Sequence, residues 1–136
     1  MRRTSRGMTL IELMIVIVIV AVLASIAVPS YRQYVLRSHR TEAKAALMNV
    51  AAAQEKFYLQ NNTYTDNLSD APPTGLGIPG TTEHGYYTIA IDAGADATAF
   101  AVTATPAGGQ AADTHCASFS IDQAGVKTAT NDDCWN

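Results

Sequence analysis

The segment Gly7-Met8-Thr9-Leu10-Ile11-Glu12 opens an apolar stretch that runs from Met8 to Val28 and decides how this chain is built. As a helix rising about 1.5 Å per residue, the 21 residues of this stretch span roughly 32 Å, against a hydrocarbon core of about 30 Å. Glu12 is the one acid in the stretch, and an acid near the centre of a membrane helix costs roughly 2.5 to 3.5 kcal/mol on insertion scales. We therefore expect Glu12 to have a function and a partner.

The residues around the stretch indicate that its helix is retained and that the following residues are exported. Arg2, Arg3 and Arg6 precede the stretch with no acid among them, and basic residues of this kind stay on the cytoplasmic side of a membrane. A cleaved secretory signal has an apolar region of about 7 to 15 residues and a small-residue site after it. Here the apolar stretch is longer, and it leads into Pro29 without an A-x-A site.

The formal net charge of the chain is −3, but the charged residues are unevenly distributed along the sequence. Residues 30–61 carry five Lys or Arg and two Glu, whereas residues 62–136 carry nine acids and a single base, Lys127. Binding to nucleic acid without sequence preference needs clustered Lys and Arg to neutralise phosphates. The composition of the C-terminal part therefore argues against that role.

The two cysteines, Cys116 and Cys134, both lie near the C-terminal end of the sequence. In an oxidising compartment a bridge between them is expected, with a contribution of roughly 3 kcal/mol in the chain-entropy model. The alternative is two buried free thiols. His115 precedes Cys116, but neighbouring positions on a strand point to opposite faces, so a catalytic Cys–His pair is not expected.

The N-terminal residues resemble the class III signal of type IV prepilins, through a short basic leader ending in Gly7, the sequence Met8-Thr9-Leu10-Ile11-Glu12-Leu13, and an unbroken apolar run with Pro29 near its end. The resemblance implies that a membrane aspartyl peptidase cleaves between Gly7 and Met8 and methylates the new N-terminus. Phe is the common first mature residue in this family, and Met8 departs from it.

The resemblance also implies that Glu12 pairs with the mature N-terminus of a neighbouring subunit during assembly. Cleavage removes three Arg, changes the formal side-chain charge from −3 to −6, and creates an ammonium group on Met8. A buried carboxylate is tolerated when it is paired. The alternative is that Glu12 lies in the interfacial region and reaches water.

Two local features of the apolar stretch follow from its side chains. Thr9 and Ser25 are expected to bond back to helix carbonyls. Pro29 lacks a backbone N–H, which predicts a kink or a local break between Ser25 and Pro29. The pilin resemblance suggests that the helix continues past Pro29 with a curve.

An amphipathic helix is expected to follow over residues 30–61, with a stripe that packs on a sheet. Its apolar positions are Tyr31, Val35, Ala43, Leu47, Val50, Ala53 (or Gln54) and Phe57. The opposite positions are Arg32, Arg37, Arg40, Lys44 and Glu55. A solvated face is expected for the three arginines, and the alternative is a contact with lipid or nucleic acid. His39 is interpreted as a satisfied or half-exposed histidine.

The remaining residues predict a loop and an antiparallel sheet. Turn-forming residues make residues 62–85 a long connection, at the position of the αβ-loop of pilins, and a role in subunit contacts is expected for it. Strands are predicted over residues 86–92, 99–105, 116–122 and 125–130, with a hairpin turn at residues 122–125. The fold class is therefore α+β, a long N-terminal helix packed on a four-stranded antiparallel sheet. The expected domains are a leader (1–7), a transmembrane and assembly helix (8–29), an amphipathic helix (30–61), the loop (62–85), and the sheet with its disulfide-bounded end (86–136).

No catalytic constellation, cofactor motif or metal-ligand spacing is found in the sequence. His39, His84 and His115 lack the spacing of a metal site, and solvated acids are favoured over a calcium site at Asp132 and Asp133 or at Asp66 and Asp70. We therefore predict a protein that is not an enzyme and has no cofactor.

The function predicted from the resemblance is that of a structural subunit of a type IV pilus, similar to the PilE-type minor pilins. Residues 57–64 and the ending Asp133-Cys134-Trp135 carry this finer similarity. The implied partners are the prepilin peptidase, other pilins and the inner-membrane assembly platform, and the implied location is the bacterial inner membrane and then the extracellular pilus. The pilus is expected to support twitching motility or adhesion. The alternatives are a type II secretion pseudopilin, a major pilin, a DNA-uptake pilin, and an anchored domain that never polymerises; nucleic acid is the least expected partner.

Overall fold

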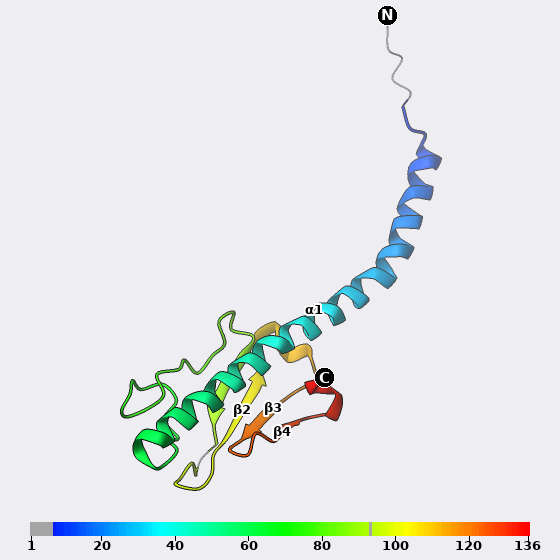
Figure 1. Cartoon of the computed structure of the whole chain (residues 1–136). Helices are drawn as coiled ribbons and strands as arrows, with labels where there is room; N and C mark the ends of the chain where they lie inside the picture. Colours follow the sequence, from blue (N-terminus) through cyan, green and yellow to red (C-terminus); the bar gives the residue numbers. More distant parts are fainter. Residues whose placement is uncertain (1–6, 93) are drawn as a thin grey trace, which may run out of the picture. The chain divides into compact units, whose positions relative to one another are not determined.

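The computed structural model describes residues 7–92 and 94–136, which fall into two compact units, Met1–Val35 and Leu36–Asn136. We call residues 7–35 the stem and residues 36–136 the head. The elements in chain order are α1 (Leu10–Asn61), β1 (Tyr87–Ile91), β2 (Ala101–Pro106), the 3-10 helix η1 (Gly108–Ala112), β3 (Phe119–Asp122), β4 (Lys127–Ala129) and the 3-10 helix η2 (Asp132–Trp135) (Figure 1).

The stem is the first part of α1, and the helix passes through Pro29 without interruption. Of the two predicted outcomes, the local break is wrong, because Pro29 removes one backbone hydrogen bond while the turns on both sides keep theirs, and the helix continues as the pilin resemblance suggested. The kink at Pro29 stays a prediction. Ser25 bonds back as expected, its Oγ donating to the Val22 carbonyl oxygen at 2.7 Å. The many β-branched residues of the stem favour a helix weakly in water, but a segment inside a bilayer has to satisfy its backbone hydrogen bonds internally.

In the head, α1 packs one face on the sheet, and Figure 1 shows this part of the helix running along the strands. Ala43, Leu47 and Val50 are buried, as the helical spacing predicts. The next buried position is Gln54 and not Ala53. The Gln54 amide is satisfied there, because its Nε2 donates to the Thr65 carbonyl oxygen at 2.6 Å and its Oε1 accepts the Thr65 N–H at 3.1 Å.

The sheet is antiparallel throughout, with the strands in the order β1-β2-β3-β4. Its register places Ile89 opposite Ala104, and Ala104 opposite Phe119, so these three buried side chains line one face. The four predicted strands and the α+β class are confirmed. The third strand begins at Phe119 and not at Cys116, and Ala117, which was expected to share the buried face, is exposed.

Residues 62–85, all of which are described, form the predicted long connection without a helix or a full strand. One isolated bridge joins Thr81 to Thr88 of β1. The chain folds back tightly on itself within this loop, where a Cβ added at Gly75 would lie 2.7 Å from the carbonyl oxygens of both Asn67 and Asp70. Glycine is therefore required at position 75, since no side chain fits between those oxygens.

Candidate assembly site

The bond between Gly7 and Met8 lies in an exposed segment directly before the helix. Gly7, Met8 and Thr9 have no regular secondary structure, and α1 begins at Leu10. A Cβ added at Gly7 would meet nothing within 4 Å. The packing of the described chain therefore does not require glycine at this position. The leader arginines Arg2, Arg3 and Arg6 lie outside the described residues.

Glu12 and Thr9 form a reciprocal cap on the first turn of α1. The Glu12 N–H donates to Thr9 Oγ1 at 3.2 Å, and the Thr9 N–H donates to Glu12 Oε2 at 3.4 Å. Thr9 is thus the N-cap of the helix, and the expectation that it bonds back to a helix carbonyl is wrong. The sequence signal was present, because Thr9-x-x-Glu12 has the spacing of a capping box. In the unassembled chain Glu12 therefore already has a local hydrogen-bond partner.

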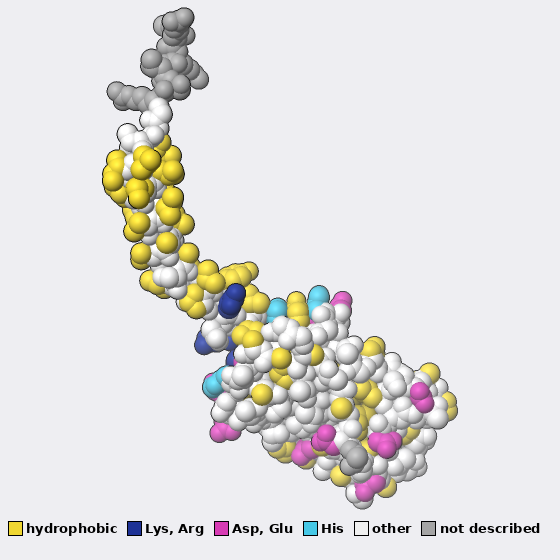
Figure 2. Space-filling view, turned by 180° about the vertical axis from the view of Figure 1, so that it is seen from behind, with side chains coloured by type: hydrophobic (Ala, Val, Ile, Leu, Met, Phe, Trp, Pro, Cys, Tyr) yellow, Lys and Arg dark blue, Asp and Glu magenta, His cyan; other side chains and the backbone are white. Residues whose placement is uncertain are grey.

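The stem presents an apolar surface along its length (Figure 2, yellow). Its large apolar side chains from Met8 to Val28 are exposed, and α1 contains a window that is long and apolar enough to cross a membrane, none of it buried in the described chain. A surface of this kind needs lipid or neighbouring apolar helices around it. Glu12 is the one carboxylate in this surface.

A buried ion pair joins α1 to the loop after η1 in the head. Arg40 donates from Nε to Asp113 Oδ2 at 2.6 Å and from Nη2 to Asp113 Oδ1 at 2.8 Å, and the two side chains are only 12% and 2% exposed. Burial alone would raise the pKa of the Asp113 carboxyl, but the hydrogen bonds and charge of Arg40 hold that pKa below its ordinary value. The predicted solvated face is therefore wrong for Arg40, because a carboxylate distant in sequence covers it.

Gln110 of η1 extends this ion pair into a buried polar network. Its Nε2 lies 3.0 Å from the Leu36 carbonyl oxygen and 2.9 Å from the Tyr87 hydroxyl oxygen, and it donates to both. Its Oε1 accepts a hydrogen bond from His39 Nδ1 at 3.0 Å, so His39 is satisfied as expected. Burial is the main reason that the pKa of Tyr87 is raised to about 12, although the bond to Gln110 acts in the opposite direction. This network fixes the beginning of the head's helix to the sheet.

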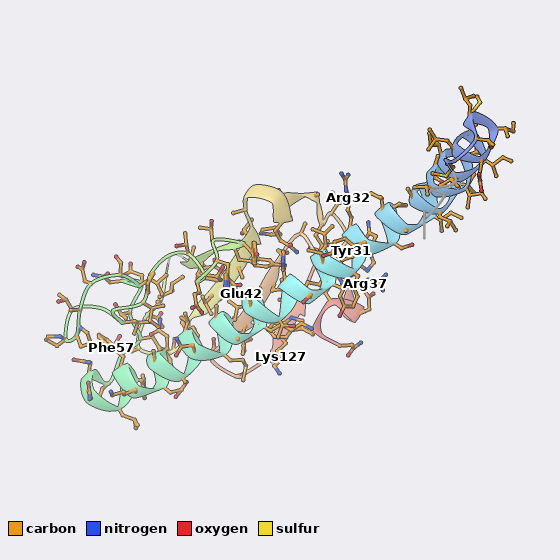
Figure 3. All side chains as sticks on the ribbon, turned by 90° about the horizontal axis from the view of Figure 1, so that it is seen from above. Tyr31, Arg32, Arg37, Glu42, Phe57 and Lys127 are labelled. Carbon is orange, nitrogen blue, oxygen red and sulfur yellow. A yellow bond between two sulfur atoms is a disulfide. The ribbon has the colours of Figure 1, made fainter. Side chains whose placement is uncertain are left out.

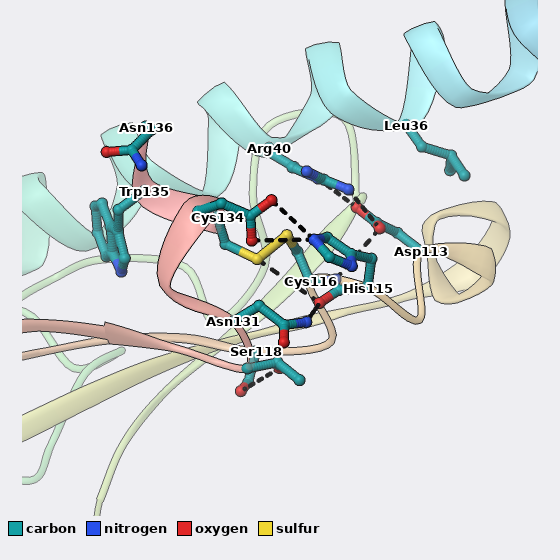
Figure 4. Close-up of a disulfide and its surroundings, with 12 residues drawn as sticks. Leu36, Arg40, Asp113, His115, Cys116, Ser118, Asn131, Cys134, Trp135 and Asn136 are labelled. Carbon is teal, nitrogen blue, oxygen red and sulfur yellow. Dashed lines mark hydrogen bonds and ion pairs between the residues drawn. A yellow bond between two sulfur atoms is a disulfide. The ribbon is translucent and has the colours of Figure 1, made fainter.

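Cys116 and Cys134 are joined in a buried disulfide, as expected, with Cα atoms 5.8 Å apart (Figure 4). Beside it, His115 Nε2 lies 3.0 and 2.9 Å from the two carboxylate oxygens of Asp133. The hydrogen bond from His115 is the largest cause of the lowered pKa of Asp133. His115 and Cys116 were expected to point apart as strand neighbours. They instead lie in a turn, and a donor atom of His115 is within 4.8 Å of both cysteine sulfurs.

The exposed cations are few in the described part of the chain. Arg32 and Arg37 of α1 form no ion pair with any described residue, and Figure 3 shows Arg32 pointing away from the helix. In the head, Lys127 Nζ lies 5.3 Å from the centre of the Trp135 ring. Arg32 and Arg37 are close together on α1 and Lys127 is distant from both in sequence, while Figure 2 shows acidic side chains (magenta) spread over the head.

Two hollows lie on the described surface of the head. One, of about 230 Å³, lies beside Lys56, Phe57 and Leu76. The other, of about 270 Å³, contains Asp92 and Asp122. Asp122 Oδ1 accepts the N–H groups of Ala124 and Val126 at 2.9 Å, so this carboxylate already holds the turn after β3.

The residues singled out from the sequence therefore fall into two separate sets. Gly7, Met8 and Glu12 lie together at the start of the stem, whereas Cys116 and Cys134 lie in the head. Sequence reasoning missed Gln110 and Asp113, the buried partners of the helix. No local pattern marks either of them, because their partners lie about 70 positions away.

Two family models match consecutive parts of the chain, and the second begins at Pro29. The N-terminal residues 2–28 match the prokaryotic N-terminal methylation motif. Residues 29–120 match the model described as "Type IV minor pilin ComP, DNA uptake sequence receptor". The second match covers more than half of the chain.

The chain is also similar to curated and solved type IV pilins. The type IV major pilin PilA of Myxococcus xanthus is 40% identical over 52% of this chain and 34% of its own length. The major pilin PilE1 of Neisseria gonorrhoeae is 34% identical over 67% of this chain and 41% of its own length. The chain thus spans less than half the length of both.

A solved type IV pilin from Shewanella oneidensis has a TM-score of 0.53 and 28% identity, and the match covers 74% of this chain and 98% of that one. The long helix, the four-stranded antiparallel sheet and the methylation motif therefore agree with the family matches, and this chain belongs to the type IV pilins, in the family of the ComP-type minor pilin model.

Proposed function

We propose that this chain is a minor subunit of a type IV pilus. It enters the inner membrane as a prepilin with its head on the periplasmic side, is cleaved and methylated at Met8, and joins the filament through the stem. The assembled filament serves pilus biogenesis together with twitching motility or adhesion. The ComP-type minor pilin match supports this role more strongly than that of a major pilin.

The observation that carries the proposal is the position of Glu12. It is the one carboxylate in the apolar stem, and among the described residues it accepts only a weak hydrogen bond, from the Thr9 N–H at 3.4 Å. Cleavage after Gly7 creates an ammonium group on each processed subunit. A neighbour's ammonium placed against Glu12 forms a charged pair, which in an apolar surrounding is far more favourable than an unpaired carboxylate.

The assembly platform would act on this arrangement. A subunit leaves the membrane when its stem packs against the stems already present, and the apolar surface then passes from lipid to protein. Because both surroundings are apolar, burial of apolar area by itself does not choose the register of the new subunit. The Glu12–ammonium pair sets this register, since at every other register the two charges would be left unpaired in an apolar surrounding.

The test separates the charge of Glu12 from its capping role. Glu12→Gln keeps an oxygen that can accept the Thr9 N–H, since Gln also serves in capping boxes, but it cannot pair with an ammonium. Glu12→Ala removes both interactions. We expect both variants to be retained in the membrane and to be lost from sheared filaments by at least tenfold. Wild-type incorporation of Glu12→Gln would overturn the pairing mechanism.

The processing step has a separate measurement. The intact mass and the N-terminal sequence of the chain recovered from filaments should correspond to a chain that begins at N-methylated Met8. Gly7→Val should leave the full leader on the chain without changing the stability of the head, because nothing in the described chain lies within 4 Å of that added Cβ. A mature chain beginning at any other residue would remove the prepilin assignment.

A second candidate function is DNA binding, favoured by the printed description of the family model. The exposed cations that could contact phosphates are Arg32, Arg37, Lys56 and Lys127. Binding of the full chain in detergent to duplex DNA, measured against salt concentration, tests this function. A log–log slope near zero would exclude phosphate contacts, whereas each contact adds about −0.9 to the slope. Lys127→Gln should reduce the slope by about one unit if the head is the binding part.

A further inference from the structure

Three potential metal ligands converge at the disulfide of the head (Figure 4). Donor atoms of His115, Cys116 and Cys134 all lie within 4.8 Å of one another. Asp133 brings a fourth donor, because its carboxylate oxygens lie 2.9 and 3.0 Å from His115 Nε2. Two sulfurs, an imidazole and a carboxylate are a donor set that zinc accepts.

Hydrogen bonds that do not involve the sulfur–sulfur bond hold the two segments together. Asn131, which precedes η2, donates from Nδ2 to the His115 carbonyl oxygen at 2.6 Å. On the other segment, Asp113 Oδ1 accepts the Cys116 N–H at 3.3 Å, and Asp113 is fixed by Arg40. We therefore expect the two cysteines to stay near each other after the bridge is reduced.

We propose that the reduced head binds one Zn²⁺ ion through the thiolates of Cys116 and Cys134 and the imidazole of His115, with the Asp133 carboxylate as the fourth ligand. Reduction by a dithiol transfers two electrons to the disulfide, giving two thiols and an oxidised dithiol. Binding of Zn²⁺ then releases the two thiol protons. The metal replaces the hydrogen bond between His115 and Asp133.

The dimensions of the cluster suit a zinc ion. Zn–S bonds of about 2.3 Å in a tetrahedron place two sulfurs about 3.8 Å apart. The cysteine Cα atoms are 5.8 Å apart, and the donor atoms of His115, Cys116 and Cys134 already lie within 4.8 Å of one another. The Asp133 carboxylate lies outside this group, and rotation of its exposed side chain would bring it to the ion. Rotation of the two cysteine side chains can open the sulfurs by the required amount while the backbone stays in place. The exposed His115 and Asp133 side chains give the ion a path to the buried sulfurs.

Such a site would act before the bridge forms. In the proposed topology, each exported head arrives with both thiols reduced. A bound zinc ion would hold η2 against the turn at Cys116, in place of the disulfide, and would protect the thiolates from oxidation to other products. Bridge formation would then expel the metal, because a partner disulfide accepts the two electrons of the thiolates together with two protons and becomes a dithiol, and Zn²⁺ is released. This inference concerns the head and does not rest on the role of Glu12 in the filament.

The experiment uses the full chain in detergent, reduced with a phosphine and titrated with Co²⁺ and then with Zn²⁺. We expect one equivalent of Co²⁺ to give thiolate charge-transfer bands and the intense visible bands of a tetrahedral site, and Zn²⁺ to displace it. The oxidised chain should give neither. Absence of the charge-transfer bands in the reduced chain would overturn the proposal.

Matched variants test the two ligands that are not cysteines. His115→Ala should weaken Zn²⁺ binding by at least tenfold, while His84→Ala, which changes a histidine that pairs with Glu42, should leave it unchanged. Asp133→Asn should weaken binding, and Asp132→Asn should not. Far-UV circular dichroism and Trp135 fluorescence of each variant confirm that the head is folded. Equal affinity in His115→Ala and wild type would reduce the site to a simple dithiol and would contradict the assignment.

Discussion

In the stem the large apolar side chains face outward, whereas the head encloses its own core of helix and sheet residues. The stem contains one carboxylate, which accepts a long hydrogen bond within a single helical turn. The head contains a buried ion pair, a buried amide network and a disulfide, each of which joins segments far apart in sequence. The difference teaches that the stem depends on lipid or neighbouring helices, while the head carries its own tertiary contacts. Changes in one part should therefore be measurable without changes in the other.

The largest effect on the head is expected from Arg40→Ala. It leaves the buried Asp113 carboxylate unpaired, and breaking a buried pair in this way costs about 3 to 5 kcal/mol. Denaturant unfolding of the full chain in detergent, followed by the fluorescence of Trp135, measures this cost, because the chain has a single tryptophan and it lies in the head. Arg37→Ala is the control and should change the free energy of unfolding by less than about 0.5 kcal/mol. Equal effects of the two changes would mean that the Arg40–Asp113 pair is not formed in solution.

Removal of the disulfide should have the next largest effect. Replacing Cys116 and Cys134 with Ser should lower the free energy of unfolding of the head by about 3 kcal/mol in the chain-entropy model. The same Trp135 transition measures it, with or without a reductant, and the reductant should affect only the wild-type chain. The helix of the stem should keep its circular dichroism signal. A loss of stem helix on reduction would show that the stability of the stem depends on that of the head.

Acid should destabilise the head by less than the loss of Arg40 does, because it protonates the carboxylate and leaves the rest of the packing in place. The pKa of Asp113 is lower in the folded head than the unfolded value of about 3.9. Its contribution is therefore complete above about pH 4 and is lost as the pH falls through the folded pKa. Trp135-monitored unfolding between pH 7 and pH 2 measures this loss.

The double variant Arg40→Met with Asp113→Leu is the control for the acid dependence. It removes both charges together, so no buried charge is left unpaired and the stability at neutral pH should change far less than in Arg40→Ala. Its unfolding free energy should also vary less with pH below about 4. An unchanged acid dependence in this variant would assign the effect to other carboxylates, such as Asp133, whose pKa is also lowered, mainly by the hydrogen bond from His115.

The smallest effect is expected at the start of the stem. Thr9→Ala removes the N-cap oxygen that accepts the Glu12 N–H, and a lost N-cap costs about 1 kcal/mol. Amide hydrogen exchange of the first turn of α1 in detergent should become faster, and Thr9→Ser should restore the wild-type rate. The Trp135 unfolding transition should not move. A change in that transition would show that the first turn contributes to the stability of the head.

Much of the fold could be predicted from the sequence because its signals are local. The apolar run defines the stem, helical spacing predicts the buried positions Ala43, Leu47 and Val50, and alternation predicts the strands. The spacing of Thr9 and Glu12 also contained the capping box, although it was not recognised from the sequence. Such signals are readable because the interacting residues are close together in the chain.

Other features of the head could not be predicted, since they depend on contacts between distant segments. The Arg40–Asp113 ion pair and the Gln110 network appear only when η1 lies against the helix. The turn that brings His115 back toward the disulfide is likewise a tertiary feature, because the sequence around it is equally compatible with a strand. The sequence by itself determined that the chain has a membrane-length helix with one carboxylate and an antiparallel head, since backbone hydrogen bonding and apolar periodicity act locally. Only the tertiary structure decided which charges are buried and which side chains meet, because desolvation and pairing depend on which surfaces are brought together in space.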